Sequence, residues 1–158
     1  DKTCPMGEYA NQKVLIENFT ENNSLVKIMR LSYVLSLDDK FSNLLKDHEK
    51  SKVKLNVFLG FKRHIVLLDD VILGVKNLIQ KWDHFDFKNI NFCGHELVDR
   101  CEMVSILKDR FYKELDYSCV EASNSFWAGR AKIIELDCSN FKEVLGRLPK
   151  QINKIKNR

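Results

Sequence analysis

Residues 58–79 read FLGFKRHIVLLDDVILGVKNLI and carry the most regular apolar pattern in the chain. Apolar side chains recur there at alternating steps of three and four residues: Phe58, Phe61, Ile65, Leu68, Ile72, Val75 and Ile79. This spacing places them on one side of an α-helix. A neighbouring row that includes His64 is also largely apolar. The pattern therefore predicts a helix over about 51–82 that has a wide buried face and crosses the middle of the fold.

The same periodicity predicts four further helices, over 10–19, 25–35, 97–115 and 123–148. Ser24 is a good N-cap for the second of them, and Pro149 is a suitable stop after the last. No stretch shows the strict alternation that marks a half-buried strand. The expected fold class is therefore all-α.

The composition is that of a soluble globular protein, with 44% apolar and 30% charged residues among 158. We expect one domain over 1–158, with an N-terminal arm over 1–8 and a C-terminal tail over 149–158. The net charge of +4 is too small and too evenly spread to favour a nucleic-acid partner. The sequence has no run of about 18 uncharged apolar residues, so no membrane span is expected.

Motifs of common enzyme classes are absent from the sequence. It contains no G-x-S-x-G, no H-E-x-x-H, no P-loop and no dinucleotide-binding G-x-G-x-x-G. The adjacent carboxylates Asp38-Asp39 and Asp69-Asp70 would point to different faces of a helix, so they do not suggest a catalytic pair. We therefore expect that the protein is not an enzyme.

Several features favour secretion to an extracellular site. The chain starts with Asp1, and two glycosylation sequons begin at Asn18 and Asn22. Cysteines stand at positions 4, 93, 101, 119 and 138, and none forms the C-x-x-C pair of a zinc knuckle. Disulfides suit an oxidising compartment, and an odd number of cysteines leaves at least one thiol free or bound to another chain.

Two histidines have a spacing that suits a haem pocket. His64 lies in the predicted wide-faced helix, and His95 follows it by 31 residues (95 − 64). Haem is a flat apolar disc whose iron needs a basic nitrogen, and a second imidazole across the disc can hydrogen-bond a bound diatomic ligand. His84 is a rival ligand, but it lies only 20 residues from His64 (84 − 64), which is short for reaching the opposite face of the disc.

These residues resemble the globin family at the level of a pattern of spacings. The run Phe61-Lys62-Arg63-His64 and the apolar residues after it look like the globin helix that carries the distal histidine. Phe41 precedes His64 by 23 residues (64 − 41), and residues 40–44 look like the start of the globin segment whose phenylalanine packs on haem. The resemblance implies an all-α, globin-like fold of about seven to eight helices around one haem b.

The resemblance also implies a function and a set of site residues. His95 would be the proximal iron ligand and His64 the distal residue, with Phe41, Phe61 and Leu68 against the haem. The protein would be an extracellular carrier or store of O₂, binding it reversibly at five-coordinate iron. Similarity to extracellular invertebrate globins further implies a disulfide between Cys4 and Cys138, for which Cys119 is a rival to Cys138.

A second interpretation explains the helices, sequons and cysteines equally well. It is a secreted, disulfide-bonded helical bundle without haem, such as a cytokine-like protein or a salivary or venom effector, that acts by binding another protein. In either case a free cysteine or an exposed helix face would allow a homo- or hetero-oligomer to form.

Overall fold

The computed structural model describes residue 5 and residues 7–156, and its fold is not all-α. Short helices alternate with short strands, and four of the five strand pairings are parallel among the described residues. Parallel strands need long crossover connections, which most often contain a helix. The prediction of an all-α, globin-like fold is therefore wrong.

The stretch that was expected to be one long helix is a run of four elements. Gly60 has a φ of +78°, which no residue inside an α-helix adopts, and it separates two strands. Ile65, Val66 and Leu67 are buried in succession, as happens in a parallel strand covered on both faces. The helical period is real only from Leu68 onward. The elements are β3 (Leu55–Phe58), β4 (Lys62–His64), β5 (Val66–Leu67) and α3 (Leu68–Gln80).

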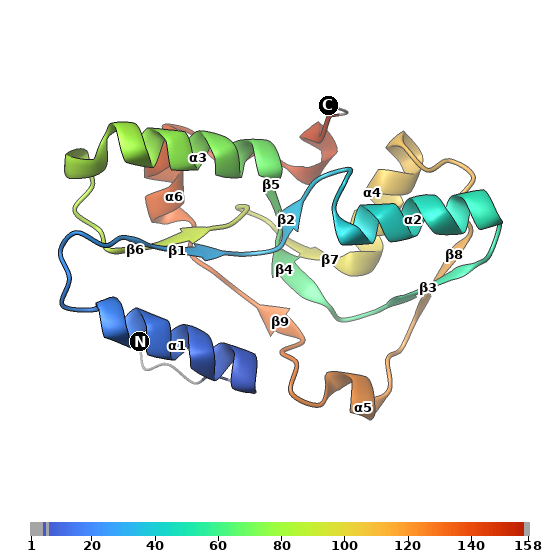
Figure 1. Ribbon diagram of the computed structural model, residues 1–158. Helices are drawn as coiled ribbons and strands as arrows, with labels where there is room; N and C mark the ends of the chain where they lie inside the picture. The colour runs from blue at the N-terminus through green and yellow to red at the C-terminus, as the bar shows by residue number, and fades with distance from the viewer. Residues whose placement is uncertain (1–4, 6, 157–158) are drawn as a thin grey trace.

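One half of the molecule, which we call the β1 lobe, is built on a parallel pair of strands. The pair aligns Ile28 with Asn89 and Leu31 with Phe92. Helices α3 and α6 pack on one face of the pair, and α1 lies on the other (Figure 1). The elements of this lobe are α1 (Glu8–Thr20), β1 (Ile28–Leu31), α3, η1 (Trp82–His84), β6 (Asn89–Phe92) and α6 (Ser139–Leu145).

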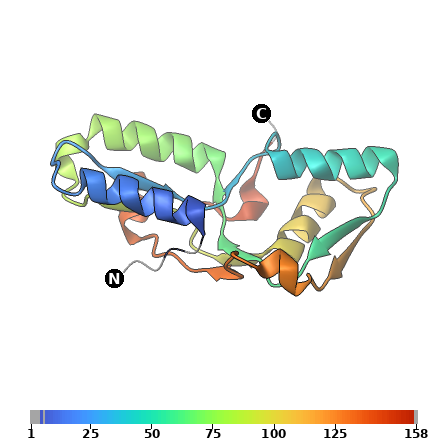
Figure 2. The same cartoon turned by 60° about the horizontal axis from the view of Figure 1, so that its bottom comes forward.

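The other half, which we call the disulfide lobe, has its own parallel pair and its own apolar core. Strand β3 pairs with β8, aligning Leu55 with Tyr117, and a disulfide between Cys101 and Cys119 joins α4 to β8. Figure 2 shows the two lobes side by side. The further elements of this lobe are α2 (Lys40–Ser51), α4 (Arg100–Arg110), β8 (Tyr117–Val120), α5 (Asn124–Trp127) and η2 (Ile152–Lys154).

The lobes meet along strands whose side chains face each of them in turn. Val66 belongs to the core of the β1 lobe, whereas its neighbours Ile65 and Leu67 belong to the core of the disulfide lobe. Gly94 packs against Ile65 at this junction, where an added Cβ would lie 2.0 Å from the Ile65 carbonyl oxygen. The junction strands are β2 (Val34–Leu35) paired with β5, and β4 between β7 (Leu97–Asp99) and β9 (Ile133–Ile134).

Other predicted elements fared unevenly. The helix expected over 10–19 is confirmed as α1, but the one expected over 25–35 is replaced by β1 and β2. The helix expected over 123–148 breaks into α5, β9 and α6, with Gly129 at a φ of +71° between the first two. The segment assigned to a C-terminal tail contributes Ile152 and Ile155 to the core of the disulfide lobe.

Candidate functional site

The junction between the lobes holds two arginines on one aromatic ring. The guanidinium carbons of Arg63 and Arg100 each lie 3.9 Å from the centre of the Phe61 ring. Local structure fixes all three residues, because Arg63 lies in β4 and Arg100 opens α4. Asp99 caps that helix by accepting from the Cys101 amide, and the Arg100 amide donates to the Phe61 carbonyl at 3.1 Å. Attraction of cations to an aromatic face holds the cluster together.

The charges of this cluster lack carboxylate partners. Arg63 donates to the carbonyl oxygens of Lys62, Ala131 and Lys132, and among the described residues neither arginine lies within ion-pair distance of a carboxylate. Burial lowers the pKa of both arginines, and repulsion by Arg100 adds to the lowering at Arg63. The nearby Asp99 charge raises the pKa of Arg100 and offsets part of this lowering, but no carboxylate of the described residues bonds either guanidinium, so the cluster is suited to an anion.

An open hollow adjoins the arginines on the side of α2. Phe41 lines this hollow and also lies 5.1 Å from the Arg100 guanidinium carbon. Tyr33 lines it too, just beyond the carboxyl end of β1, where parallel α/β sheets bind their ligands. Burial raises the pKa of Tyr33, and nearby Asp39 raises it further, so its hydroxyl stays protonated. The hollow has a volume of about 840 Å³.

Aromatic side chains continue the site on the side of α5. The ring of Trp127 stacks on Phe61 with 6.2 Å between centres, and the Lys132 ammonium lies 5.3 Å from the centre of the Trp127 ring. Arg63 holds the backbone after α5 in place through its bonds to the carbonyls of Ala131 and Lys132. The site thus combines cations with flat apolar faces, the two surfaces that phosphate groups and nucleobases need.

The first turn of α1 comes close to the same loop. A Cβ placed on Gly7 would lie 4.0 Å from the carbonyl oxygen of Gly129, two residues after Trp127. Tyr9, in that first turn, is 74% exposed, and the Lys13 ammonium lies 5.1 Å from the centre of its ring. The backbone just before Tyr9 therefore lies beside the loop that follows Trp127.

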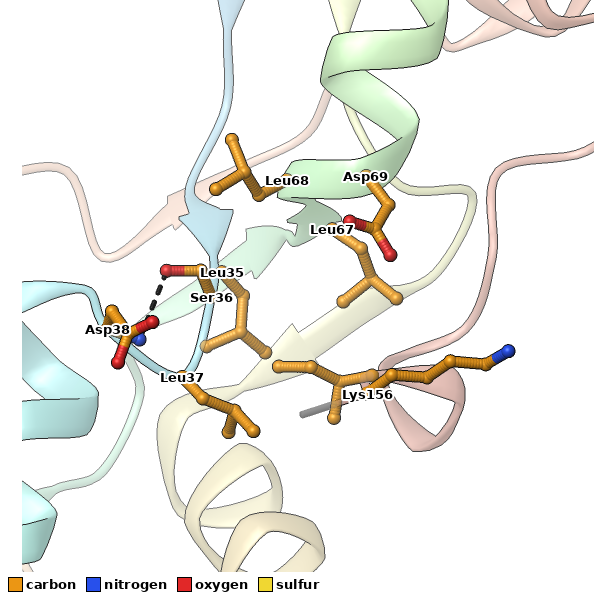
Figure 3. A pocket seen from close by; sticks show the side chains of 9 residues that line it. Leu35, Ser36, Leu37, Asp38, Leu67, Leu68, Asp69 and Lys156 are labelled. Atoms are coloured by element: carbon orange, nitrogen blue, oxygen red, sulfur yellow. Dashed lines mark hydrogen bonds between the residues drawn. The ribbon is translucent and has the colours of Figure 1, made fainter. Parts of the chain in front are cut away.

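A second pocket, of about 310 Å³, lies at the carboxyl ends of β2 and β5 (Figure 3). Leu35, Leu67 and Leu37 form its apolar floor, and Lys156 is its single lining cation. Asp38 and Asp69 stand at its rim, so an anionic ligand would meet two carboxylates there. We therefore take the arginine cluster as the candidate site.

The residues predicted to hold haem do not form a haem pocket. His64 lies in β4 with Nδ1 3.0 Å from the Gly94 carbonyl oxygen, and His95 lies in a loop with Nε2 3.5 Å from Glu96. Leu68 opens α3, while Phe41 and Phe61 belong to the arginine cluster. Among the described residues there is also no group of three or more His, Cys, Asp or Glu side chains that could hold a metal.

The structure excludes Cys119, the rival partner, from pairing with Cys4 and leaves the Cys4–Cys138 pairing untested. Cys119 is bonded to Cys101, and Cys138 is a free thiol among the described residues. Cys4 lies outside the described residues, so its pairing stays a prediction. Cys93 is also free, and burial raises the pKa of its thiol to about 12.

The sequence analysis missed the arginines, Tyr33, Trp127 and the Tyr9–Lys13 pair as site residues. The run Phe61-Lys62-Arg63 was visible, but it was assigned to a helix, where Arg63 would have faced solvent. Arg100 lies 37 residues after Arg63 (100 − 63), and only the antiparallel pairing of β4 with β7 brings them together. The one local signal was the spacing of Tyr9 and Lys13, which places them on one helix face.

Comparisons with known proteins agree with this architecture. Neither a protein-family model nor a curated protein matches the sequence, whereas many solved structures match the fold. A Tyr-to-Phe variant of UDP-glucuronic acid 4-epimerase from Bacillus cereus, solved with UDP-4-deoxy-4-fluoro-glucuronic acid and NAD, superposes with a TM-score of 0.70 at 18% identity. UDP-glucose-4-epimerase from Stenotrophomonas maltophila, with NAD and formylated UDP-arabinopyranose, gives 0.78 at 12%.

An NAD-dependent NDP-hexosamine 5,6-dehydratase involved in tunicamycin biosynthesis gives a TM-score of 0.70 at 15% identity. The matches cover 97–98% of this chain but only 54–55% of those three proteins. The chain therefore spans about half the length of these structural neighbours.

These neighbours overturn the functional predictions. They bind NAD and are sugar-nucleotide epimerases or dehydratases, so haem b, an O₂ carrier and the expectation of a non-enzyme are contradicted. The alternative of a helical-bundle interaction protein fails with the all-α fold. No helix within the described residues is long and apolar enough to cross a membrane, as expected. Secretion stays a prediction.

Proposed function

We propose that this chain forms the nucleotide-sugar-binding part of an NAD-dependent epimerase or dehydratase, with Arg63 and Arg100 binding the diphosphate. The observation that carries the proposal is the pair of guanidiniums on Phe61 without carboxylate partners. A guanidinium presents several N–H donors in a plane, which matches the oxygens of a phosphate group.

The surroundings of the arginines support a nucleotide sugar over a simple phosphate. The half-buried indole of Trp127, stacked on Phe61, provides a flat face against which a base can stack. The adjoining hollow of about 840 Å³ is within the range of small-molecule sites. Its polar lining residues are Asp39, Lys40, Asn43 and Asp47; two carboxylates there suit the hydroxyl groups of a sugar, while the arginines take the diphosphate.

Tyr9 is the residue that we propose for proton transfer at the sugar. Redox chemistry at a carbon that bears a hydroxyl requires that the hydroxyl proton leave and return, and a tyrosine can act as the acid and base. Tyr9 is exposed, has Lys13 beside its ring, and follows Gly7, which lies beside the loop after Trp127. The Bacillus cereus neighbour was crystallised with a tyrosine replaced by phenylalanine, which is consistent with this choice.

NAD, which the neighbours bind, does not fit the described residues of this chain by itself. A pyrophosphate binds at a helix N-terminus that follows a strand through a glycine-rich turn. Helices α3 and α4 directly follow strands, but α3 carries Asp69 and Asp70 in its first turn and α4 begins at Asp99. Their carboxylates would repel the phosphates. We therefore assign no step to NAD within this chain.

Titration of the chain with UDP-glucose, followed by calorimetry, tests the diphosphate site. Arg100→Gln and Arg63→Lys should each weaken binding roughly 10- to 100-fold, because a hydrogen bond to a charged partner is worth about 1.5–3 kcal/mol. Arg110→Gln is the matched control, since Arg110 also lies over an aromatic ring, that of Phe111, but is remote from the site. Folded variants that bind as tightly as the wild type would refute the proposal.

The proton-transfer role has a separate readout. In the complete enzyme with NAD, Tyr9→Phe should lower kcat at least tenfold while UDP-glucose binds within about twofold of the wild type. A loss of binding without a change in kcat would assign Tyr9 to ligand contact instead.

A further inference from the structure

A disulfide joins the two segments that carry the arginine cluster and its aromatic face. Cys101 directly follows Arg100 in the first turn of α4, and its bond to Cys119 reaches across to β8. The chain continues from β8 to α5, where Trp127 lies eight residues after Cys119 (127 − 119). One covalent bond therefore connects the segment of Arg100, which we assign to the diphosphate, to the segment of Trp127, which we assign to the base.

On the Cys101 side, polar contacts fix the start of α4 to the backbone of Phe61. The Asp99 carboxylate accepts from the Cys101 amide at 2.8 Å and from the Gly60 amide at 3.1 Å. The Arg100 amide donates to the Phe61 carbonyl oxygen at 3.1 Å. A shift of Cys101 would therefore also move Arg100 relative to the ring on which its guanidinium lies.

On the Cys119 side, strand β8 leads into the aromatic part of the site. Cys119 stands opposite Val57 of β3 in the parallel pair. Farther along the chain, the ring of Phe126 lies 4.5 Å from that of Phe58, with Trp127 beside it. Both α4 and β8 contact β3, and the disulfide links these two elements to each other a second time.

The cysteines differ in their access to solvent. Cys119 is exposed, whereas Cys101 is half-buried. Cys93, which lies outside the disulfide, is fully buried, and burial raises the pKa of its thiol to about 12, so it is a poor nucleophile. Exposed disulfides exchange with thiols more readily than enclosed ones. The sulfur of Cys119 is therefore the one that a small thiol in solution can attack.

We propose that the Cys101–Cys119 disulfide is an exchange site for small thiols such as glutathione, and that its reduction lowers the affinity of the arginine cluster for a nucleotide sugar. The inference rests on the proposed function and deepens it by naming a regulation of the same site. With the bond intact, Arg100 and Trp127 are held at one separation, which suits a ligand that contacts both. With the bond broken, the ligand has to order the two segments itself, and this ordering weakens binding.

The exchange consists of two substitutions at sulfur. A thiolate attacks the Cys119 sulfur, a new S–S bond forms, and the electron pair of the old bond leaves on the Cys101 sulfur, which takes a proton from water. A second thiolate attacks the sulfur of the bound small thiol and releases Cys119, which is protonated in turn. Two small thiols are thereby oxidised to one disulfide, and the protein disulfide is reduced to two thiols.

Calorimetry with UDP-glucose on the oxidised and the reduced chain tests the proposal. Reduction by dithiothreitol should weaken binding roughly three- to tenfold, because one or two side chains that contact the ligand then become ordered only on binding. The double variant Cys101→Ser, Cys119→Ser should bind like the reduced wild type and should not respond to dithiothreitol. The double variant Cys93→Ser, Cys138→Ser is the matched control and should keep the full response, since these cysteines lie outside the disulfide.

Two results of this titration would overturn the proposal. One is equal affinity of the oxidised and reduced wild type with unchanged circular dichroism. The other is a loss of circular dichroism on reduction, which would assign the disulfide to stability alone. If the oxidised chain does not bind UDP-glucose at all, the proposed diphosphate site fails, whereas tight binding that ignores reduction contradicts the regulation alone.

Peptide mapping identifies the attacked sulfur and needs no nucleotide sugar. After incubation with reduced glutathione and alkylation of free thiols, the mixed disulfide should be found on Cys119 and the alkyl group on Cys101. The reverse arrangement, or a disulfide that stays intact, would overturn the exchange site.

Discussion

The disulfide lobe and the β1 lobe differ in how fully their helices pack through apolar side chains. In the disulfide lobe, α2 and α4 enclose a core that includes Leu45, Leu107 and Leu115, and a disulfide joins α4 to β8. In the β1 lobe, α3 and α6 bury Phe92 and Phe141, but α1 has no buried residue. Helix stability in proteins comes mainly from packing of an apolar face, whereas α1 is held by polar contacts among the described residues.

The difference shows that the helices of one lobe can all be packed through apolar side chains while a helix of the other lobe is not. In the β1 lobe, the Lys88 ammonium holds the end of α1 by donating to the carbonyls of Thr20, Glu21 and Asn23. These contacts set the position of α1 but bury little apolar surface. Substitutions at the junction, in each lobe and on α1 should therefore have graded effects.

The largest effect is expected at the junction, for Gly94→Ala. Its added Cβ would lie 2.0 Å from the Ile65 carbonyl oxygen, and backbone cannot yield as a side chain does. We expect a loss of about 3 kcal/mol or more in the free energy of unfolding, measured by urea titration. Gly146→Ala is the control, since it meets no atom within 4 Å and costs only about 1–2 kcal/mol for its φ of +68°. Equal losses would show that the lobes are not coupled through Gly94.

Removal of the disulfide comes next and should act within one lobe. The double variant Cys101→Ser, Cys119→Ser opens a loop that spans 18 residues, which corresponds to about 3 kcal/mol in the chain-entropy account. Hydrogen exchange should accelerate in α4 and β8 far more than in β6. Cys138→Ser serves as the control because this thiol forms no disulfide among the described residues. Uniform acceleration in both lobes would mean that they unfold as one unit.

A smaller loss is expected for Asp70→Asn in α3, whose side chain contacts the segment between α6 and η2. The fully buried Asp70 carboxylate accepts from Arg147 at 2.5 Å and from the Lys150 amide at 2.6 Å. Asparagine keeps the shape but loses the charge, so thermal unfolding should report a loss of about 2 kcal/mol. The exposed Asp86→Asn should change stability by less than about 0.5 kcal/mol. If Asp70→Asn leaves stability unchanged, the Asp70–Arg147 ion pair does not help to join the lobes.

The smallest effect is expected on the outer face of α1, for Phe19→Ser. Phe19 is 92% exposed, so its loss should change the unfolding free energy of the chain by less than about 0.5 kcal/mol. Val14→Ser, on the half-buried face of the same helix, should cost more. A loss above about 1 kcal/mol for Phe19→Ser would show that α1 is packed in solution, and the contrast between the lobes would disappear.

Sequence patterns predicted the parts of this fold that depend on near neighbours. Helix α1 follows its local period, and the residues after Leu68 do as well. The patterns failed where burial on both faces erased alternation, as at Ile65–Leu67, because a continuous apolar run suits a buried strand and a buried helix equally. Within the site, Phe41 and Phe61 were singled out only because the globin resemblance placed them against a haem. Their arginine partners could not be found, since strand pairing alone brings Arg100 to Phe61.

The spacing of the parallel pairs has a consequence for how the chain comes to be folded. The paired residues of β1 and β6 are 61 positions apart in the sequence (89 − 28), and those of β3 and β8 are 62 apart (117 − 55). Contacts so distant along the chain make folding slow, and during synthesis they leave strand edges unpaired while the partner is still being made. The hydrogen bonds from Arg63 to the carbonyls of Ala131 and Lys132 can form only later, because these residues are synthesised after β8. The arginine cluster is therefore among the last features to assemble, and a ligand that binds it stabilises only chains that have completed their folding.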